Sequence, residues 1–188
     1  MKKMEGAHIH MNEDKEATTY WITGYSGVGK TTVGRELYKI LKQKNAACVF
    51  LDGDKFREVF GNDWGYTKED RYRGAMSLVR LCELLTSQDI DVVCCTVSMF
   101  NEVREWGRKH IKNYIEVYLK VSANLLQKRN QKDLYSGHAQ GSVSNVVGLD
   151  LQLDEPRNTD IVIENDGSIS AIAAAQMILK RESYYAKR

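Results

Sequence analysis

Residues 24–31 read Gly-Tyr-Ser-Gly-Val-Gly-Lys-Thr and match the phosphate-binding pattern GxxxxGK[ST] in full. A β-rich run at residues 18–23 precedes the motif, and a helical spacing of apolar residues over 30–43 follows it. Glycines let the backbone turn with positive φ and approach phosphates, and N–H groups at the start of a helix point at the anion. The sequence therefore predicts a P-loop that binds ATP, with Lys30 on the β- and γ-phosphates and the Thr31 hydroxyl on Mg²⁺.

The rest of the chain alternates apolar, strand-like runs with amphipathic, helical ones. Strands are predicted at residues 46–51, 91–98, 115–121 and 160–164, and helices at 68–87, 101–112, 124–130 and 168–181. Continuously apolar strands are typical of a parallel sheet that is buried on both faces. We therefore predict an α/β fold of the P-loop NTPase class, with about five parallel strands and helices on both faces.

The length of the chain, 188 residues, fits a single domain with one core. We predict a flexible N-terminal tail over residues 1–16 and a single P-loop domain over 17–188. Residues 129–150 are polar and contain three glycines, and polar segments of that length are usually functional or disordered. We therefore predict a lid around residues 131–158 that closes over both substrates and excludes water.

Charge and cysteine usage argue against several classes of protein. The formal net charge is only +2 without a block of Lys and Arg, so no nucleic-acid partner is expected. No apolar run approaches the ~20 residues that span a bilayer, so no membrane association is expected, and the polar N-terminus does not read as a secretory signal. The four cysteines form no CxxC pair and no Cys/His cluster, which favours a reduced, cytoplasmic protein without zinc.

Among P-loop proteins, the sequence favours a kinase that acts on a small molecule. A GTPase would carry Asn-Lys-x-Asp, but residues 130–133 read Asn-Gln-Lys-Asp, and no DxxG switch follows the second or third strand. A mechanical ATPase would be larger and would carry a strand that ends in adjacent acids. A nucleotide-binding module without activity is a further alternative, against which the complete P-loop and Asp54 argue.

Charged residues follow the second predicted strand at its carboxyl end, the edge where open α/β sheets hold ligands. There, Asp54 can accept the proton of an attacking hydroxyl, Asp52 can orient water on Mg²⁺, and Arg57 can hold an anionic acceptor. The alternative is that Asp-Gly-Asp forms a simple turn, and the local sequence does not decide between the two.

Polar residues also open the two following helices. They are Asp70, Arg71 and Arg73 in the first helix, and Ser98, Asn101, Arg104 and Arg108 before and within the second. Taken alone, the residues of the first helix are better explained as a solvated helix face. For each residue of the second group, a polar helix start is at least as good an interpretation.

Seven segments stand in the order found in adenylyl-sulfate kinases, a family that this chain resembles from about residue 20 to 167. The segments are WITGYSGVGKTT, LDGDKFR, GYTKEDR, VSMFNEVREWGR, RNQKDLY, VVGLD and EPRNTDIVIEN. The LDGDxxR and EDR segments are much more specific than the P-loop alone. The resemblance implies an α/β P-loop fold, a homodimer, and transfer of the γ-phosphoryl group of ATP to the 3′-hydroxyl of adenylyl sulfate with Mg²⁺.

The resemblance also implies a role for each matching residue. Catalytic roles fall to Lys30, Asp54 and Ser98, with Asp54 as the base and direct in-line transfer rather than phosphorylation of Ser98. Thr31 and Asp52 are the expected metal contacts. The expected ATP contacts are Gly24, Ser26, Gly27, Val28, Gly29, Lys30, Thr31, Thr32 and Arg129. The expected acceptor contacts are Asp54, Arg57, Tyr66, Arg71, Ser98, Met99, Phe100, Lys132, Leu134 and Val147.

The sequence departs from the family in the acceptor half of the site. Two family phenylalanines that sandwich the acceptor adenine correspond to Tyr66 and Val147, and a family Asn corresponds to Gly74. Residues 136–145 contain no Lys or Arg where the family has a basic run. Similar chains in bacterial capsule pathways resemble cytidine diphosphoramidate kinases, so a cytidine nucleotide conjugate stays open as an alternative acceptor.

Overall fold

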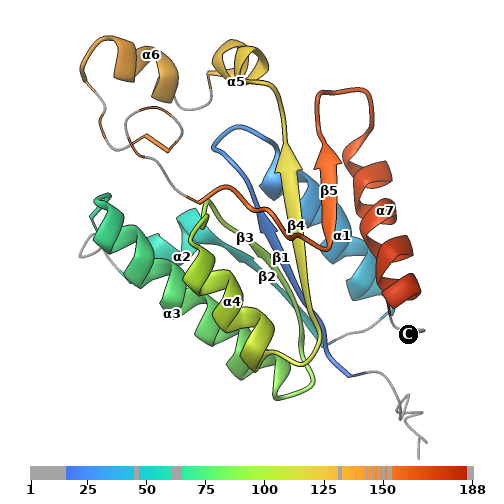
Figure 1. The fold of residues 1–188 in the computed structure, drawn as a ribbon. Coiled ribbons are helices and arrows are strands. Elements are labelled where there is room, and N and C mark those ends of the chain that lie inside the picture. The colour runs from blue at the N-terminus through green and yellow to red at the C-terminus, as the bar shows by residue number, and fades with distance from the viewer. Residues whose placement is uncertain are drawn as a thin grey trace, which may run out of the picture.

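The computed structural model describes residues 16–44, 47–60, 65–130, 133–142, 144, 146, 147, 149, 151 and 154–185. Its sheet has five parallel strands in the order β2-β3-β1-β4-β5 (Figure 1). The strands are β1 (Thr19–Thr23), β2 (Cys48–Asp52), β3 (Asp91–Cys95), β4 (Tyr114–Lys120) and β5 (Ile161–Glu164). The predicted α/β fold with a five-stranded parallel sheet is therefore confirmed.

Helices cover both faces of the sheet (Figure 1). They are α1 (Lys30–Lys44), α2 (Gly53–Val59), α3 (Lys68–Thr86), α4 (Asn101–His110), α5 (Ala123–Arg129), α6 (Leu134–Ala139) and α7 (Ala171–Tyr185). Side chains alternate along β1, so that Tyr20 and Ile22 pack with α1 and α7, while Trp21 packs with α3 and α4. The two resulting cores explain why the strands read as continuously apolar.

Two elements differ from the sequence-based prediction. β3 ends at Cys95 rather than near residue 98. Its last bond to β1 runs from Thr96 N to Ile22 O, and β1 then leaves the sheet at Gly24. Instead of a simple turn, α2 begins directly after β2, because the Asp52 carboxylate accepts hydrogen bonds from Asp54 N and Lys55 N as its N-cap.

The predicted tail and lid are covered only in part. Residues 1–15 of the tail lie outside the described residues, as do several positions of the lid. The described part of the lid includes the short helix α6 (Figure 1). The four cysteines are buried and free.

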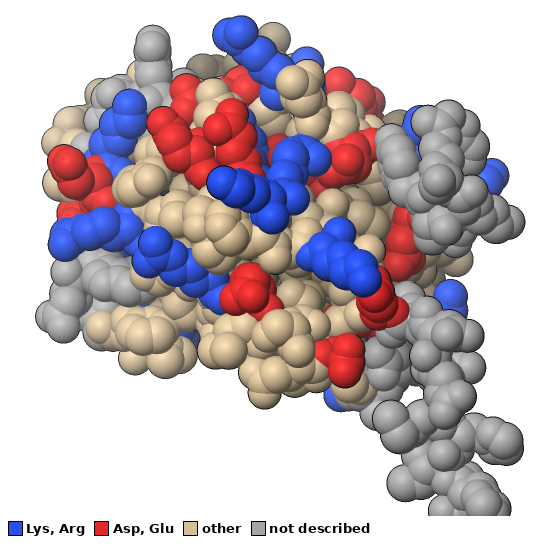
Figure 2. Space-filling model, turned by 60° about the horizontal axis from the view of Figure 1, so that its bottom comes forward, with Lys and Arg blue, Asp and Glu red and all other residues tan. Residues whose placement is uncertain are grey.

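The parallel arrangement places the carboxyl ends of all five strands at one edge of the sheet. The P-loop leaves β1 there, α2 leaves β2, and the segment with Ser98 leaves β3. On the opposite end of the molecule, Lys and Arg are interspersed with Asp and Glu (Figure 2). Among the described helices, none is long and apolar enough to span a membrane.

Candidate active site

The P-loop turns through three glycines with positive φ. The φ angle is 144° at Gly24, 85° at Gly27 and 95° at Gly29, values that residues with a Cβ rarely adopt. A Cβ on Gly24 would lie 2.3 Å from the Leu119 carbonyl oxygen, and a Cβ on Gly29 would lie 2.6 Å from Asn165 Nδ2. The glycines are therefore required both by the turn and by the close approach of neighbouring segments.

Lys30 is buried and reaches back into the loop. Its Nζ donates to the carbonyl oxygens of Gly24 at 2.9 Å and of Tyr25 at 2.8 Å. These acceptors stabilise a buried ammonium that would otherwise be costly to remove from water. The positive charge is thus held where the loop's N–H groups can also face an anion.

The carbonyl groups of the loop are hydrogen-bonded to side chains from other segments. Asn165 Nδ2 donates to Val28 O at 2.7 Å, and Arg129 Nη1 donates to Gly27 O at 3.2 Å. Arg129 Nη2 donates in turn to Asn165 O at 2.9 Å. Because a loop that turns its N–H groups inward exposes its carbonyl groups, these donors hold the anion-binding conformation in place.

Arg129 and Asn165 also line a hollow beside the loop, together with Gly27, Gly29, Thr32, Val33 and Ala171. The sequence predicts Arg129 and Thr32 as ATP contacts, whereas Asn165, the last residue of the EPRNTDIVIEN segment, was assigned no role. Its position directly after β5, at the carboxyl edge of the sheet, is the signal that would have found it.

Thr31 and Asp52 lie side by side, as the predicted metal site requires. The Thr31 hydroxyl donates to Asp52 Oδ2 at 2.8 Å. Mg²⁺ prefers oxygen ligands and is usually bound by one or two protein groups plus substrate phosphates. A hydroxyl and a carboxylate next to the P-loop fit that preference, although no cluster of three acidic, His or Cys side chains occurs in the described part of the chain.

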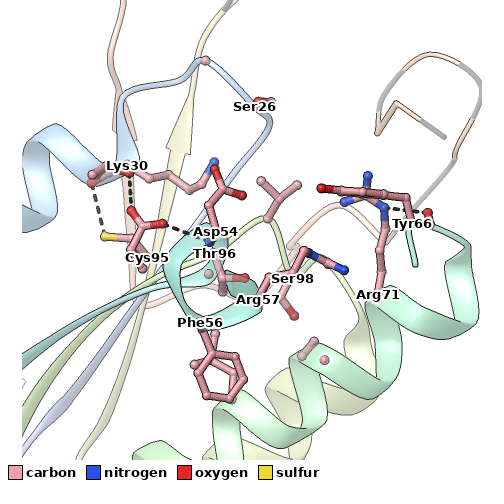
Figure 3. Close-up of a pocket in the computed structure, with 18 of the residues that line it drawn as sticks. Ser26, Lys30, Asp54, Phe56, Arg57, Tyr66, Arg71, Cys95, Thr96 and Ser98 are labelled. Carbon is pink, nitrogen blue, oxygen red and sulfur yellow. Dashed lines mark hydrogen bonds between the residues drawn. The ribbon is translucent and has the colours of Figure 1, made fainter. Parts of the chain in front are cut away.

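A single cleft joins the P-loop to the predicted acceptor residues (Figure 3). Lys30, Thr31 and Asp52 line it together with Asp54 and Arg57 of α2. The remaining predicted residues in its lining are Ser26, Gly27, Gly29, Thr32, Tyr66, Arg71 and Ser98. The structure thus brings most of the predicted site together.

Two arginines hold Tyr66 at the far end of the cleft (Figure 3). The Arg57 guanidinium lies 4.7 Å from the centre of the Tyr66 ring, and the Arg71 guanidinium lies 5.3 Å from it. Arg57 also donates to Gly65 O at 2.7 Å, and Arg71 donates to Tyr66 O at 3.0 Å. Tyr66 is 58% exposed, so this end of the cleft combines two positive charges with an accessible aromatic ring.

The charged pair next to Arg71 stays on the helix surface. Asp70 accepts hydrogen bonds from Thr67 and Arg73, at 2.6 Å each. These bonds, first that from Thr67 and then that from Arg73, hold the pKa of the Asp70 carboxyl below its ordinary value. The interpretation of Asp70 and Arg73 as a solvated helix start therefore fits the structure.

Ser98 lies on the floor of the cleft. Its hydroxyl is buried, without a hydrogen-bond partner among the residues that the structure describes. Thr23 Oγ1 donates to the Ser98 carbonyl oxygen at 3.2 Å and so ties this segment to β1. A buried, unpaired hydroxyl facing a cleft is suited to a polar ligand group.

Three of the expected acceptor contacts are packed into the protein instead of lining the cleft. Met99 and Val147 are buried with Tyr118 in one small cluster, and Phe100 lies in the core under α3 and α4. Val147 also forms an isolated bridge with Leu151. The cluster of Met99, Tyr118 and Val147 joins segments far apart in the sequence, which is why local motifs did not reveal it.

The start of the lid is tied to α5. Asn130 Oδ1 accepts hydrogen bonds from Tyr135 N at 3.1 Å and Ser136 N at 3.0 Å. Leu134, an expected acceptor contact, is the half-buried first residue of α6. The other expected contact of the lid, Lys132, lies outside the described residues.

Arg104 and Arg108 are not among the described residues that line the cleft, and both pair with Glu116 of β4. Arg104 Nε lies 3.1 Å from Glu116 Oε1, and Arg108 Nη2 lies 2.7 Å from Glu116 Oε2. Burial raises the pKa of the Glu116 carboxyl, and the two guanidiniums oppose that rise. Asp160 completes the group, because its carboxylate pairs with Arg108 at 3.1 Å.

Comparisons with known proteins agree with this geometry. The model of a family described as adenylylsulphate kinase matches residues 16–164. The chain is 37% identical over 161 residues to the cytidine diphosphoramidate kinase of Campylobacter jejuni subsp. jejuni serotype O:2, covering 86% of this chain and 94% of the relative. It is 33% identical over 165 residues to the adenylyl-sulfate kinase of Halothermothrix orenii, covering 88% and 89%.

A solved structure leads to the same family. The Mycobacterium tuberculosis APS kinase CysC in complex with AMPPNP and APS superposes with a TM-score of 0.81 and 26% identity, over 90% of this chain and 99% of that one. With its complete P-loop and a family match over most of its length, this chain belongs to the adenylylsulphate kinase family of P-loop phosphotransferases, whose acceptor is an alcohol group.

Proposed function

We propose that this protein is an ATP-dependent kinase that phosphorylates the 3′-hydroxyl of adenylyl sulfate. The observation that carries the proposal is the shared cleft: Lys30 and Thr31 of the P-loop line it together with Asp54 of α2. Phosphoryl transfer depends mainly on positioning and on charge stabilisation. A cleft that places a carboxylate opposite a phosphate-binding loop supplies both.

In the proposed mechanism, Asp54 accepts the proton of the acceptor hydroxyl as its oxygen attacks the γ-phosphorus of ATP. The new O–P bond forms while the bond to the bridging oxygen breaks, and ADP leaves with that oxygen. Lys30 stabilises the charge on the transferring phosphoryl group. Thr31 and Asp52 would hold Mg²⁺, which when bound neutralises charge on the β- and γ-phosphates.

The acceptor is held by the far end of the cleft. Arg57 and Arg71 present guanidinium groups to its anionic linkage, for which their planar fork is suited. Tyr66 is largely exposed, and its ring can stack on a base when the acceptor displaces one of the two guanidiniums that lie over it. The Ser98 hydroxyl contributes a polar contact at the floor.

A second candidate acceptor is cytidine diphosphoramidate. It is favoured by the relative that is 37% identical and carries that name. It is also favoured by Val147, which is packed with Met99 and Tyr118 and offers no second ring to sandwich a purine. Phosphorylation of either acceptor requires the same ATP-binding residues and the same general base, Asp54.

The test is ADP release with ATP-Mg²⁺ and each acceptor in turn. Efficient turnover of adenylyl sulfate supports the first candidate, and turnover of cytidine diphosphoramidate alone supports the second. Turnover of neither, with intact ATP binding, would overturn both. Omitting Mg²⁺ should abolish turnover.

We also propose that the protein forms a homodimer in a reducing cytoplasm. The family resemblance implies the dimer, and four free, buried thiols fit a reducing compartment. Light scattering of the purified protein measures its mass, and a monomeric mass would contradict the dimer.

A further inference from the structure

The last part of the lid is fastened at Asp154, the lid exit, to the start of α4, which follows the loop of residues 98–100, here called the acceptor loop because Ser98 lines the cleft. The Asp154 carboxylate oxygen Oδ2 accepts a hydrogen bond from Asn101 N at 3.2 Å. Asn101 is the first residue of α4, and the residue before it, Phe100, makes no side-chain cap. Asp154 therefore supplies from the lid exit the cap that the local sequence lacks.

A buried arginine holds Asp154 in that position. Arg104 Nη1 donates to the Asp154 carbonyl oxygen at 3.1 Å, and the same guanidinium bonds to Asn101 Oδ1 and pairs with Glu116. Arg104 is 5% exposed, so its contacts are shielded from water. The lid exit and the start of α4 are thus held by one side chain.

We infer that Asp154 is a positioning residue that couples the lid to the acceptor loop. When Asp154 is in place, the capped helix start fixes the backbone that leads from α4 back to Ser98 in the cleft lining. When Asp154 is displaced, the Asn101 N–H loses its hydrogen-bond acceptor, and the acceptor loop is no longer fixed at the start of α4. The inference rests on the proposed function, because it assigns Ser98 to acceptor binding.

The start of the lid is coupled instead to the ATP half of the site. Asn130 holds α6, and its neighbour Arg129 donates to the P-loop at Gly27 O. The two ends of the lid are therefore attached to different halves of the cleft. This separation predicts that changes at Asp154 affect the acceptor and not ATP.

The experiment compares Asp154→Ala and Asp154→Asn with Glu155→Ala as a matched control. Glu155 is the next residue and is also exposed, but it accepts a hydrogen bond from Tyr118 of β4 at 2.6 Å rather than from α4. Asp154→Ala should raise the KM for the acceptor about five- to tenfold and lower the Tm by about 2–4 °C, as expected for a lost helix cap, with the KM for ATP unchanged. Asp154→Asn should restore most of the loss, because Asn caps helices about as well as Asp.

Hydrogen–deuterium exchange of residues 98–104 in the protein alone gives a readout that needs no acceptor. Exchange should be faster in Asp154→Ala than in wild type, and unchanged in Glu155→Ala. Equal exchange in the two alanine variants, or an acceptor KM within twofold of wild type in Asp154→Ala, would overturn the coupling. If the wild type phosphorylates neither acceptor, the proposed function fails, and exchange alone decides the inference.

Discussion

The two halves of the cleft are held in different ways. On the ATP side, the carbonyl groups of the P-loop are hydrogen-bonded to Asn165 and Arg129, and Lys30 is buried against the same loop. On the acceptor side, Tyr66 is largely exposed, and Arg57 and Arg71 lie against its ring. The ATP half is preorganised, whereas the acceptor half keeps its charged groups near the surface.

This difference matches what varies among the relatives. Two of them, at 37% and 33% identity, are named for different acceptors, although both are kinases. A P-loop held in this way can serve either reaction, because the proposed ATP contacts are backbone groups and Lys30. Changes in acceptor are then expected to arise from exposed positions such as Tyr66, which can be replaced without disturbing the core.

The largest expected effect is at Asp54, where the two halves meet. Asp54→Ala should lower kcat about 10²- to 10⁴-fold, because a positioned base contributes that much. ATP affinity, measured by calorimetry, should stay nearly unchanged because the variant leaves the P-loop intact. Glu58→Ala on the same helix, whose exposed carboxylate pairs with Lys55, is the matched control. A kcat near that of wild type in Asp54→Ala would remove it as the base.

The next effect belongs to the acceptor half alone. Tyr66→Ala should raise the acceptor KM about 5- to 100-fold, since stacking of a base on an aromatic ring contributes about 1–3 kcal/mol. Tyr66→Phe keeps the ring and should stay close to wild type. The KM for ATP serves as the internal control in both variants. An equal rise in both KM values would mean that the two halves are not independent.

A smaller effect should appear in the ATP half. Asn165→Asp replaces the Nδ2 donor to Val28 O with an oxygen, which leaves the loop carbonyl group facing a negative charge. We expect the KM for ATP to rise about tenfold, as for other lost buried hydrogen bonds, with the acceptor KM unchanged. Asp166→Asn is the control, since Asp166 bonds to Ser168 rather than to the P-loop. A change confined to the acceptor KM would contradict a role of Asn165 in stabilising the P-loop.

The positions of the predicted ATP contacts follow from the sequence more directly than those of the predicted acceptor contacts, for a physical reason. The P-loop is local, because eight consecutive residues carry both its turn and its chemistry. The contact of Thr31 with Asp52 was predictable too, since carboxyl ends of parallel strands share one edge. By contrast, the partner of Arg104 is Glu116 on another element. The end of β3 at Cys95 likewise depends on where β1 leaves the sheet, which no local pattern reports.

Substitution of Val147 tests most directly whether the acceptor site reaches into the interior. It is expected to have the smallest effect on acceptor binding. If the acceptor adenine needed a second ring at this position, Val147→Phe should lower the KM for adenylyl sulfate. The structure instead packs Val147 against Met99 and Tyr118, so the larger side chain should overpack that cluster at a cost of about 1–3 kcal/mol. We expect a Tm about 2–10 °C lower in a thermal melt, with the acceptor KM changed less than about twofold.

The matched control for this variant is Val162→Phe on β5, where the side chain is 53% exposed and the Tm should hold. A stable Val147→Phe variant with tighter adenylyl sulfate binding would show that this position reaches the cleft. The acceptor half would then extend into the cluster around Met99. The contrast between a preorganised ATP half and an exposed acceptor half would no longer hold. If Val147→Phe is destabilised and its acceptor binding is unchanged, acceptor recognition belongs to the exposed side chains of Arg57, Tyr66 and Arg71. These side chains can respond to an acceptor without repacking the interior.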